Sequence, residues 1–221
     1  MKTTLITLAA ILAAAATAHA QIDVSNIKSI TVNKSASNAA VTGTREIGRS
    51  SLECVYKAVA PERGNEQEPV RMKEDRMILQ TGGAVSKFYS YYNFAKDSLL
   101  KADPNNALKA VEHKNGTAAC LYTGYPEAGR LTLTDAVAST YYTYEDKVPQ
   151  IKWTIGDQTR EILGYKCRRA DCDLYGRHFT AWFTDEIPVA SGPWKLQGLP
   201  GLIMAAADDE GLYSFEIIGL R

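Results

Sequence analysis

Short segments in which apolar and polar residues alternate recur along most of this 221-residue chain, and they constrain its fold more than any other feature. Side chains of a β-strand point to opposite faces in turn, so an alternating segment presents one apolar face. In residues 51–60, for example, Leu52, Cys54, Tyr56 and Ala58 share a face. Similar patterns bounded by turn-forming residues predict further strands at residues 70–80, 86–94, 118–123, 130–133, 139–145, 152–155, 161–173, 176–184, 202–207 and 212–220.

Residues 95–112 are the one interval that breaks this pattern. Apolar residues there cluster on either side of Pro104 at helical rather than alternating spacing. We therefore predict a short helical insertion in an otherwise β-rich chain.

Many short strands with a single helical insertion favour one antiparallel sheet. Such a sheet must curve or close to protect its edges and bury one face. We predict a strongly curved sheet, a bowl or half-barrel. The alternative is a two-sheet β-sandwich, which strand patterning alone does not distinguish from it.

The N-terminal residues have the pattern of an export signal. Lys2 is followed by an apolar run from Leu5 to Ala16 and then by Ala18-His19-Ala20, a small-x-small cleavage site. We predict a cleaved signal peptide at residues 1–20, a flexible leader with one short edge strand at residues 21–48, and a single β-rich domain at residues 49–221. The expected destination is the periplasm, the outer-membrane surface or the extracellular medium.

The charge balance of the chain argues against nucleic-acid binding, and its apolar runs argue against a membrane-spanning helix after the signal peptide. Equal numbers of basic and acidic residues, 25 of each in the full chain, leave no electrostatic footprint for nucleic acid. No later apolar run approaches the length of a membrane-spanning helix. We expect neither nucleic-acid binding nor a transmembrane segment after signal removal.

Residues 176–203 hold an unusual density of shape-fixing residues. They contain two of the three Trp and three of the eight Pro of the chain. Pro188 and the Gly192-Pro193 pair predict that the preceding strand stops near Ile187. The tetrapeptide Leu199-Pro200-Gly201-Leu202 predicts a type II turn with positive φ at Gly201.

This region carries a family resemblance. ILGYKC at 162–167, AWFTDEIP at 181–188 and GPWKLQGLPGLI at 192–203 resemble the signature of the GLPGLI family. That family comprises exported proteins of bacteria with an outer membrane, of unknown function. It is more distantly similar to the bowl-like N-terminal domain of a secreted peptide-N-glycosidase. The resemblance covers residues 152–203 and supplies no catalytic, cofactor-binding or metal-binding residue. It implies structural roles for Tyr165, Arg177, Trp182, Pro188, Pro193, Trp194, Gly198, Leu199, Pro200, Gly201, Leu202 and Ile203, and we expect Trp182 and Trp194 to pack the loop over one end of the sheet.

The four cysteines, Cys54, Cys120, Cys167 and Cys172, predict a disulfide, because an even number in an exported protein favours pairing. In one strand Cys167 and Cys172 would lie roughly 16 Å apart, whereas a disulfide requires Cα atoms within about 7 Å. Each would therefore bond to Cys54 or Cys120. The alternative is a set of buried reduced thiols.

Metal and nucleophile chemistry have little support in the sequence. No CxxC pair is present, and His113 and His178 are the only histidines after the signal peptide, so we expect no metal or cofactor. No GxSxG nucleophile elbow is present, and Cys172 with His178 is a weak nucleophile–base pair.

Two functions remain open. Clustered aromatics, Tyr89-Tyr91-Tyr92 and Tyr141-Tyr142-Tyr144, could line a concave surface. They favour a non-catalytic binding or structural module of the bacterial envelope, with an envelope protein, a glycan or an apolar molecule as its partner. The alternative is an envelope-acting hydrolase that uses the carboxylates of Asp185-Glu186 or Asp208-Asp209-Glu210.

Overall fold

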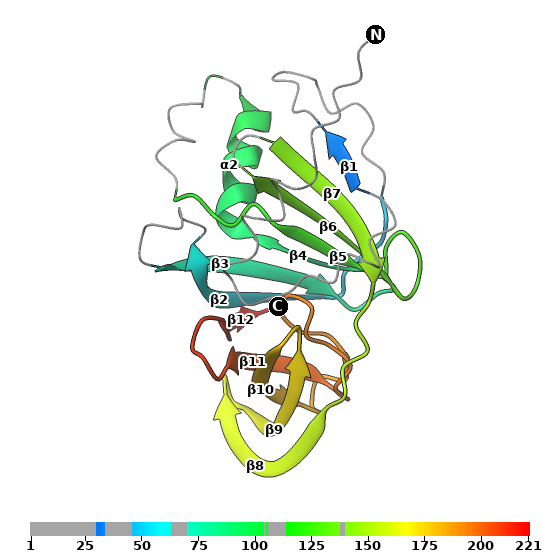
Figure 1. Ribbon diagram of the computed structural model, residues 1–221, viewed down its shortest axis with the longest axis vertical. Coiled ribbons are helices and arrows are strands. Elements are labelled where there is room, and N and C mark those ends of the chain that lie inside the picture. The colour runs from blue at the N-terminus through cyan, green and yellow to red at the C-terminus, as the bar shows by residue number, and fades with distance from the viewer. Residues whose placement is uncertain (1–29, 34–45, 63–69, 104, 106–113, 138–139) are drawn as a thin grey trace.

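The computed structural model describes residues 30–33, 46–62, 70–103, 105, 114–137 and 140–221 (Figure 1). These residues form one helix and twelve strands. The elements in chain order are β1 (Ile30–Asn33), β2 (Leu52–Glu62), β3 (Arg71–Thr81), β4 (Ser86–Ser90), α2 (Tyr91–Ala102), β5 (Cys120–Thr123), β6 (Arg130–Val137), β7 (Thr140–Lys147), β8 (Thr154–Ile162), β9 (Tyr165–Leu174), β10 (Arg177–Thr184), β11 (Leu202–Asp208) and β12 (Ser214–Leu220).

All twelve strands belong to one antiparallel sheet. Its order is β1-β7-β6-β5-β4-β3-β2-β12-β11-β10-β9-β8. Two meanders, β2 to β7 and β8 to β12, are joined by the pairing of β2 with β12, and β1 adds to the β7 edge. The two meanders form the upper and lower halves of Figure 1. Strands β1 and β8 end the sheet and do not pair with each other, so the sheet is curved but open. The predicted curved sheet is confirmed, and continuous pairing across β2 and β12 rules out two separate sheets.

The N-terminal predictions lie mostly outside the described residues. This is so for residues 1–20 and for most of the leader. Strand β1 lies at the edge of the sheet, where Ile30 to Asn33 pair with β7, in agreement with the short edge strand predicted within residues 21–48. None of the helices in the described part of the chain is long and apolar enough to cross a membrane.

Several predicted boundaries are wrong; β6, for example, continues to Val137 rather than ending at residue 133. The largest errors are two, and the first lies within residues 152–173. The expected strand at 161–173 is two strands, because Leu163 and Gly164 both have positive φ, 50° and 82°. Positive φ at both residues defines a two-residue type I′ hairpin turn. Tyr175 and Gly176, at φ 51° and 75°, make the same turn between β9 and β10. The first turn was not predicted because Leu163 is apolar and lies in a run of apolar residues, which is typical of a continuous strand.

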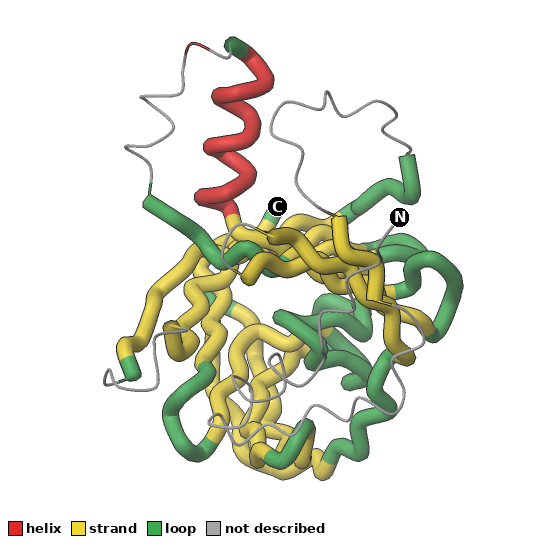
Figure 2. The backbone as a smooth tube through the Cα atoms, turned by 45° about the horizontal axis from the view of Figure 1, so that its top comes forward, coloured by secondary structure: helices red, strands yellow, loops and turns green. Residues whose placement is uncertain are grey.

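The second correction concerns residues 91–94, which are helical rather than extended. Helix α2 starts at Tyr91 because the Ser90 hydroxyl accepts a hydrogen bond from the Asn93 amide, the capping contact expected of Ser at this position. The helix lies outside the curl of the sheet (Figure 2), where Phe94 contacts Tyr89 with ring centroids 5.7 Å apart. Residues 106–112 of the predicted insertion lie outside the described residues.

The core lies on the inner face of the curved sheet. Tyr56 of β2 is fully buried and donates a hydrogen bond to the carbonyl of Ile203, 2.7 Å away. Phe88 of β4 contacts both Tyr56 and Phe215 edge-on at 6.2 Å. Since Phe215 belongs to β12 and Ile203 to β11, these contacts join the two halves.

Ser90 generates a prediction about stability. Its hydroxyl donates a hydrogen bond to the carboxylate of Asp75, 3.0 Å away. Both Ser90 and Asp75 are almost fully buried. Ser90→Ala removes this hydrogen bond and the helix cap, and we expect it to lower the free energy of unfolding by about 2 kcal/mol. Urea denaturation measures the change. Ser98→Ala, on the exposed part of the same helix, is the control; equal losses in the two variants would contradict this role for Ser90.

Candidate binding site: the motif segment and the rim cleft

The connection between β10 and β11, residues 185–201, is here called the motif segment. It lies against the inner face of the sheet, where two of its leucines belong to the core. Leu196 and Leu199 are buried in the same core cluster as residues of both sheet halves. Ser191 shares a 3.0 Å hydrogen bond with Thr81 of β3, and the Trp153 indole donates to the carbonyl of Gln197 at 2.8 Å. The chain itself therefore occupies much of the inner surface that the sequence suggested could hold a ligand.

Glycines let the motif segment approach the sheet closely. Gly201 does not have the positive φ that the predicted type II turn requires; positive φ occurs at Gly198, at 89°. A Cβ atom on Gly201 would lie 1.9 Å from the carbonyl oxygen of Thr184. Glycine is required at position 201 by contact between two backbone segments rather than by turn conformation.

Gly201→Ala should therefore be strongly destabilising. The backbone atoms of Thr184 and Asp185 would have to move, and we expect a loss of about 3 kcal/mol or more in the free energy of unfolding. Gly219→Ala is the matched control in β12, because its Cβ would meet no atom within 4 Å. We expect the control to change stability by less than about 1 kcal/mol. Equal denaturation midpoints for the two variants would contradict the close contact between the backbones of Gly201 and Thr184.

The two tryptophans of the motif have different surroundings. Trp194 stacks on Tyr213 at 6.5 Å and 9°, and it also contacts Tyr175 and Phe179. It thereby joins the motif segment to the β9–β10 turn, to β10 and to the β11–β12 connection. Trp182 lies instead on the other face of β10, where the guanidinium of Arg160 sits 4.6 Å from its ring centroid.

The acidic residues considered for hydrolysis have separate partners. Asp208 and Glu210 both bind Arg177, at 2.8 and 2.7 Å, and the Arg177 guanidinium lies over the ring of Tyr213. Asp185 pairs with Arg168 at 3.6 Å, and Glu186 accepts a hydrogen bond from the Lys166 amide. The two acidic groups thus stabilise different turns, and the carboxylates of neither group line the cleft described below.

The predicted disulfides are absent, and all four cysteines are free thiols. Cys54, Cys167 and Cys172 are buried, whereas Cys120 is partly exposed. Burial raises the pKa of Cys54 and of Cys172 to about 12 and that of Cys167 to about 11. The alternative of buried reduced thiols therefore describes three of the four cysteines.

His178 does not meet Cys172. In the pairing of β9 with β10, His178 is opposite Asp173 and Cys172 is opposite Phe179, so the two side chains project to opposite faces. The His178 ring bonds to Asp173 at 2.9 Å. His113 lies outside the described residues, and no group of three His, Cys, Asp or Glu in the described part of the chain could hold a metal ion.

The thiols give a second prediction about the folded state. Because thiolates are the reactive species and burial disfavours them, Cys54, Cys167 and Cys172 should resist iodoacetamide at pH 8 until the protein unfolds. Reductant should leave the melting temperature unchanged. A lower melting temperature in reductant would instead reveal a disulfide.

A cleft of about 250 Å³, here called the rim cleft, lies where the motif segment meets the connections β3–β4 and β5–β6. Its polar side chains are neutral: the hydroxyls of Thr81, Ser86, Thr123 and Ser191 and the amide of Gln197. Small residues complete the wall, among them Gly83, Gly124 and Gly129. A Cβ on Gly124 would lie 2.2 Å from the carbonyl of Ala84, so the two connections touch through their backbones.

Sequence reasoning missed Lys195, which lies in the motif segment between Ser191 and Gln197. Its ammonium is 4.6 Å from the ring centroid of Tyr175, 5.6 Å from that of Trp194 and 6.0 Å from that of Tyr144 on β7. Burial lowers the pKa of this ammonium, opposed by the negative charge of Asp146. Its place beside Trp194 in the motif was the only signal in the sequence.

Comparisons with known proteins find one similarity in the motif and another in the overall fold. The model of a family described as a protein of unknown function (Porph_ging) matches residues 175–205, which include the motif segment. Two crystal structures of PNGF-II, in the P21 and C2 space groups, are similar in fold, with TM-scores of 0.50 and 0.51 at 12% and 13% identity. The similarity covers 78% and 77% of this chain but only 28% and 27% of those chains. A search of curated proteins found no match. The chain is thus similar in its motif to a family of unknown function and in its curved sheet to part of PNGF-II.

Proposed function

We propose that this protein is an exported, non-catalytic binding module of the bacterial envelope that holds a glycan in the rim cleft. Export rests on the signal-peptide pattern of residues 1–20. The observation that carries the binding proposal is the lining of the cleft. Four hydroxyl-bearing residues and one amide line it among glycines and other small residues, and two of the hydroxyls, those of Thr81 and Ser191, hydrogen-bond to each other.

The chemistry of this lining favours a polyhydroxylated ligand over an apolar one. Hydroxyl and amide groups donate and accept hydrogen bonds, as sugar hydroxyls do. Neutral polar groups fix orientation in a small-molecule site, while surrounding apolar atoms such as those of Val148 and Ala84 contact the sugar ring.

The hydrolase alternative has less support. Glycoside hydrolysis needs two carboxyl groups on either side of the scissile bond. Asp185 of the motif segment instead pairs with Arg168, and Asp208 of β11 pairs with Arg177.

Isothermal titration of residues 21–221 with neutral tri- and tetrasaccharides tests the proposal. Thr123→Val keeps the shape of a cleft residue but removes its hydroxyl, and we expect at least about tenfold weaker binding. Thr134→Val is the matched control, because its hydroxyl bonds to Thr143 and does not line the cleft. Failure of every saccharide to bind would overturn the proposal, and product formation during the titration would favour the hydrolase.

A further inference from the structure

We propose that helix α2 rests on a negatively charged lipid surface, with its apolar face against the acyl chains. This interaction surface is separate from the rim cleft and goes beyond the proposed function. Three observations carry the proposal: an accessible apolar face, the cations around that face and the position of the helix on the molecule.

One face of α2 is apolar and accessible. Its residues follow one another at intervals of three and four and line a groove of about 380 Å³: Tyr91, Phe94, Ala95, Ser98, Leu99 and Ala102. Tyr91 and Phe94 are 40% and 49% exposed, and none of the twelve residues of the helix is buried. A continuous exposed apolar face of this kind is typical of a site that contacts a protein or a membrane.

Two cations lie over aromatic rings at the base of this face. The guanidinium of Arg76 is 5.7 Å from the ring centroid of Tyr91. The ammonium of Lys87 is 4.3 Å from the ring centroid of Tyr89, and the ring of Tyr89 contacts Phe94. Ring faces attract a cation but do not occupy its hydrogen-bond donors. Both cations can therefore donate to a phosphate group that lies just outside the apolar face.

Three lysines add to this positive charge. Lys96 and Lys101 belong to the helix, and the ammonium of Lys114 is 5.2 Å from the ring centroid of Tyr92. Lysine and tyrosine both combine an apolar body with a polar tip, which suits the boundary between acyl chains and head groups.

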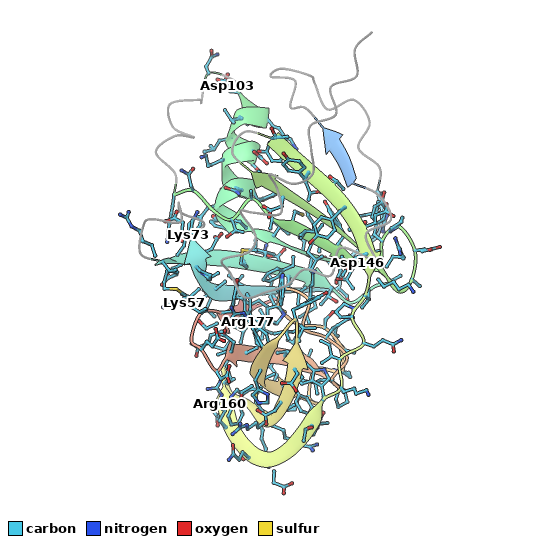
Figure 3. All side chains as sticks on the ribbon, in the orientation of Figure 1. Lys57, Lys73, Asp103, Asp146, Arg160 and Arg177 are labelled. Atoms are coloured by element: carbon cyan, nitrogen blue, oxygen red, sulfur yellow. The ribbon has the colours of Figure 1, made fainter. Side chains whose placement is uncertain are left out.

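The acidic residues near the helix do not cancel this charge. Asp97 and Asp103 do not line the groove, and Figure 3 shows Asp103 at the far end of the helix. Glu74, an exposed acid of β3, is paired with Lys57 at 3.1 Å. The excess of cations therefore favours an anionic partner, and the phosphate groups of a lipid surface attract Lys and Arg.

The helix lies where a flat surface can reach it. Figure 2 shows it outside the curl of the sheet, projecting away from the strands. All the residues that line the groove belong to the helix, so no strand or loop of the described residues walls it off. An amphipathic helix in such a position can lie in the plane of a lipid surface, with its apolar side chains among the acyl chains. A protein partner would also fit an apolar face, but the cations on tyrosine rings around it favour the lipid.

Sedimentation with vesicles tests the proposal. Residues 21–221 are mixed with vesicles of phosphatidylcholine alone or of phosphatidylcholine and phosphatidylglycerol in equal parts. We expect about tenfold or tighter binding to the anionic vesicles, because each cation near the surface contributes to the attraction. Added salt should weaken this binding, since ions screen the charges.

Two pairs of variants assign the binding to the helix. Phe94→Glu should weaken binding about tenfold or more. Its control, Leu100→Glu, places the same charge at an exposed apolar residue of the same helix that does not line the groove, and it should bind nearly as the wild type does. Arg76→Gln should weaken binding about fivefold. Lys166→Gln, in β9 of the other half, removes the same charge and is its control.

A fluorescence measurement reports directly on contact with the acyl chains. Phe94→Trp keeps an aromatic ring in the groove, and lipids brominated on their acyl chains should quench its emission more than that of the wild-type tryptophans. Unchanged circular dichroism and melting temperature verify that each variant is folded.

The remaining outcomes contradict the proposal. These are no binding to either vesicle, equal binding to both, equal losses in Phe94→Glu and Leu100→Glu, and no added quenching in Phe94→Trp. Self-association that Phe94→Glu abolishes, without vesicle binding, would assign the face to a second copy of this chain instead.

Discussion

An open, curved sheet must cover its inner apolar face with something other than its own strands, and here the motif segment does so. Strands β1 and β8 end the sheet without pairing, so strand pairing alone does not close the interior. Leu196 and Leu199 fill the core between the two halves, and glycine at position 201 allows the backbone to approach Thr184. Burial of these side chains is the main favourable term, since apolar surface removed from water contributes about 25 cal/mol per Å².

This packing determines where a ligand can bind. The hydrogen bond from Tyr56 to Ile203 and the ring contacts of Phe88 and Phe215 leave the centre of the bowl filled by the protein itself. The rim cleft lies away from this filled centre, where the motif segment meets the β3–β4 and β5–β6 connections. The motif thus has one structural role, to shape the sheet, and through Ser191 and Gln197 it also supplies part of the cleft wall.

Local patterns predicted the strands well because alternation reports directly on which face is buried. The inner face of β2, with Cys54, Tyr56 and Ala58, was identified this way. The predictions failed where a backbone or long-range contact decided the outcome. The Ser90 cap outweighs the β-preference of Tyr91 and Tyr92, and a Leu-Gly turn interrupts an apolar run at Leu163. Glycine at position 201 is the residue that a type II turn would need. Its actual role, to allow backbone contact with Thr184, cannot be seen in the sequence. The cleft and the surroundings of Lys195 combine residues far apart in the chain, and no local pattern shows such a combination.

Native-state hydrogen exchange of the Leu202 and Ile203 amides tests most directly whether the motif segment is part of the core. The Leu202 amide donates to the carbonyl of Ile187, and the Ile203 amide donates to the carbonyl of Ser191. Both acceptors belong to the motif segment. If the segment fills the sheet as described, both should open only with global unfolding, at the same free energy as the amide of Tyr56 in β2. Exchange of Leu202 and Ile203 at a much lower free energy than Tyr56 would show that the segment opens independently, and it would contradict this account.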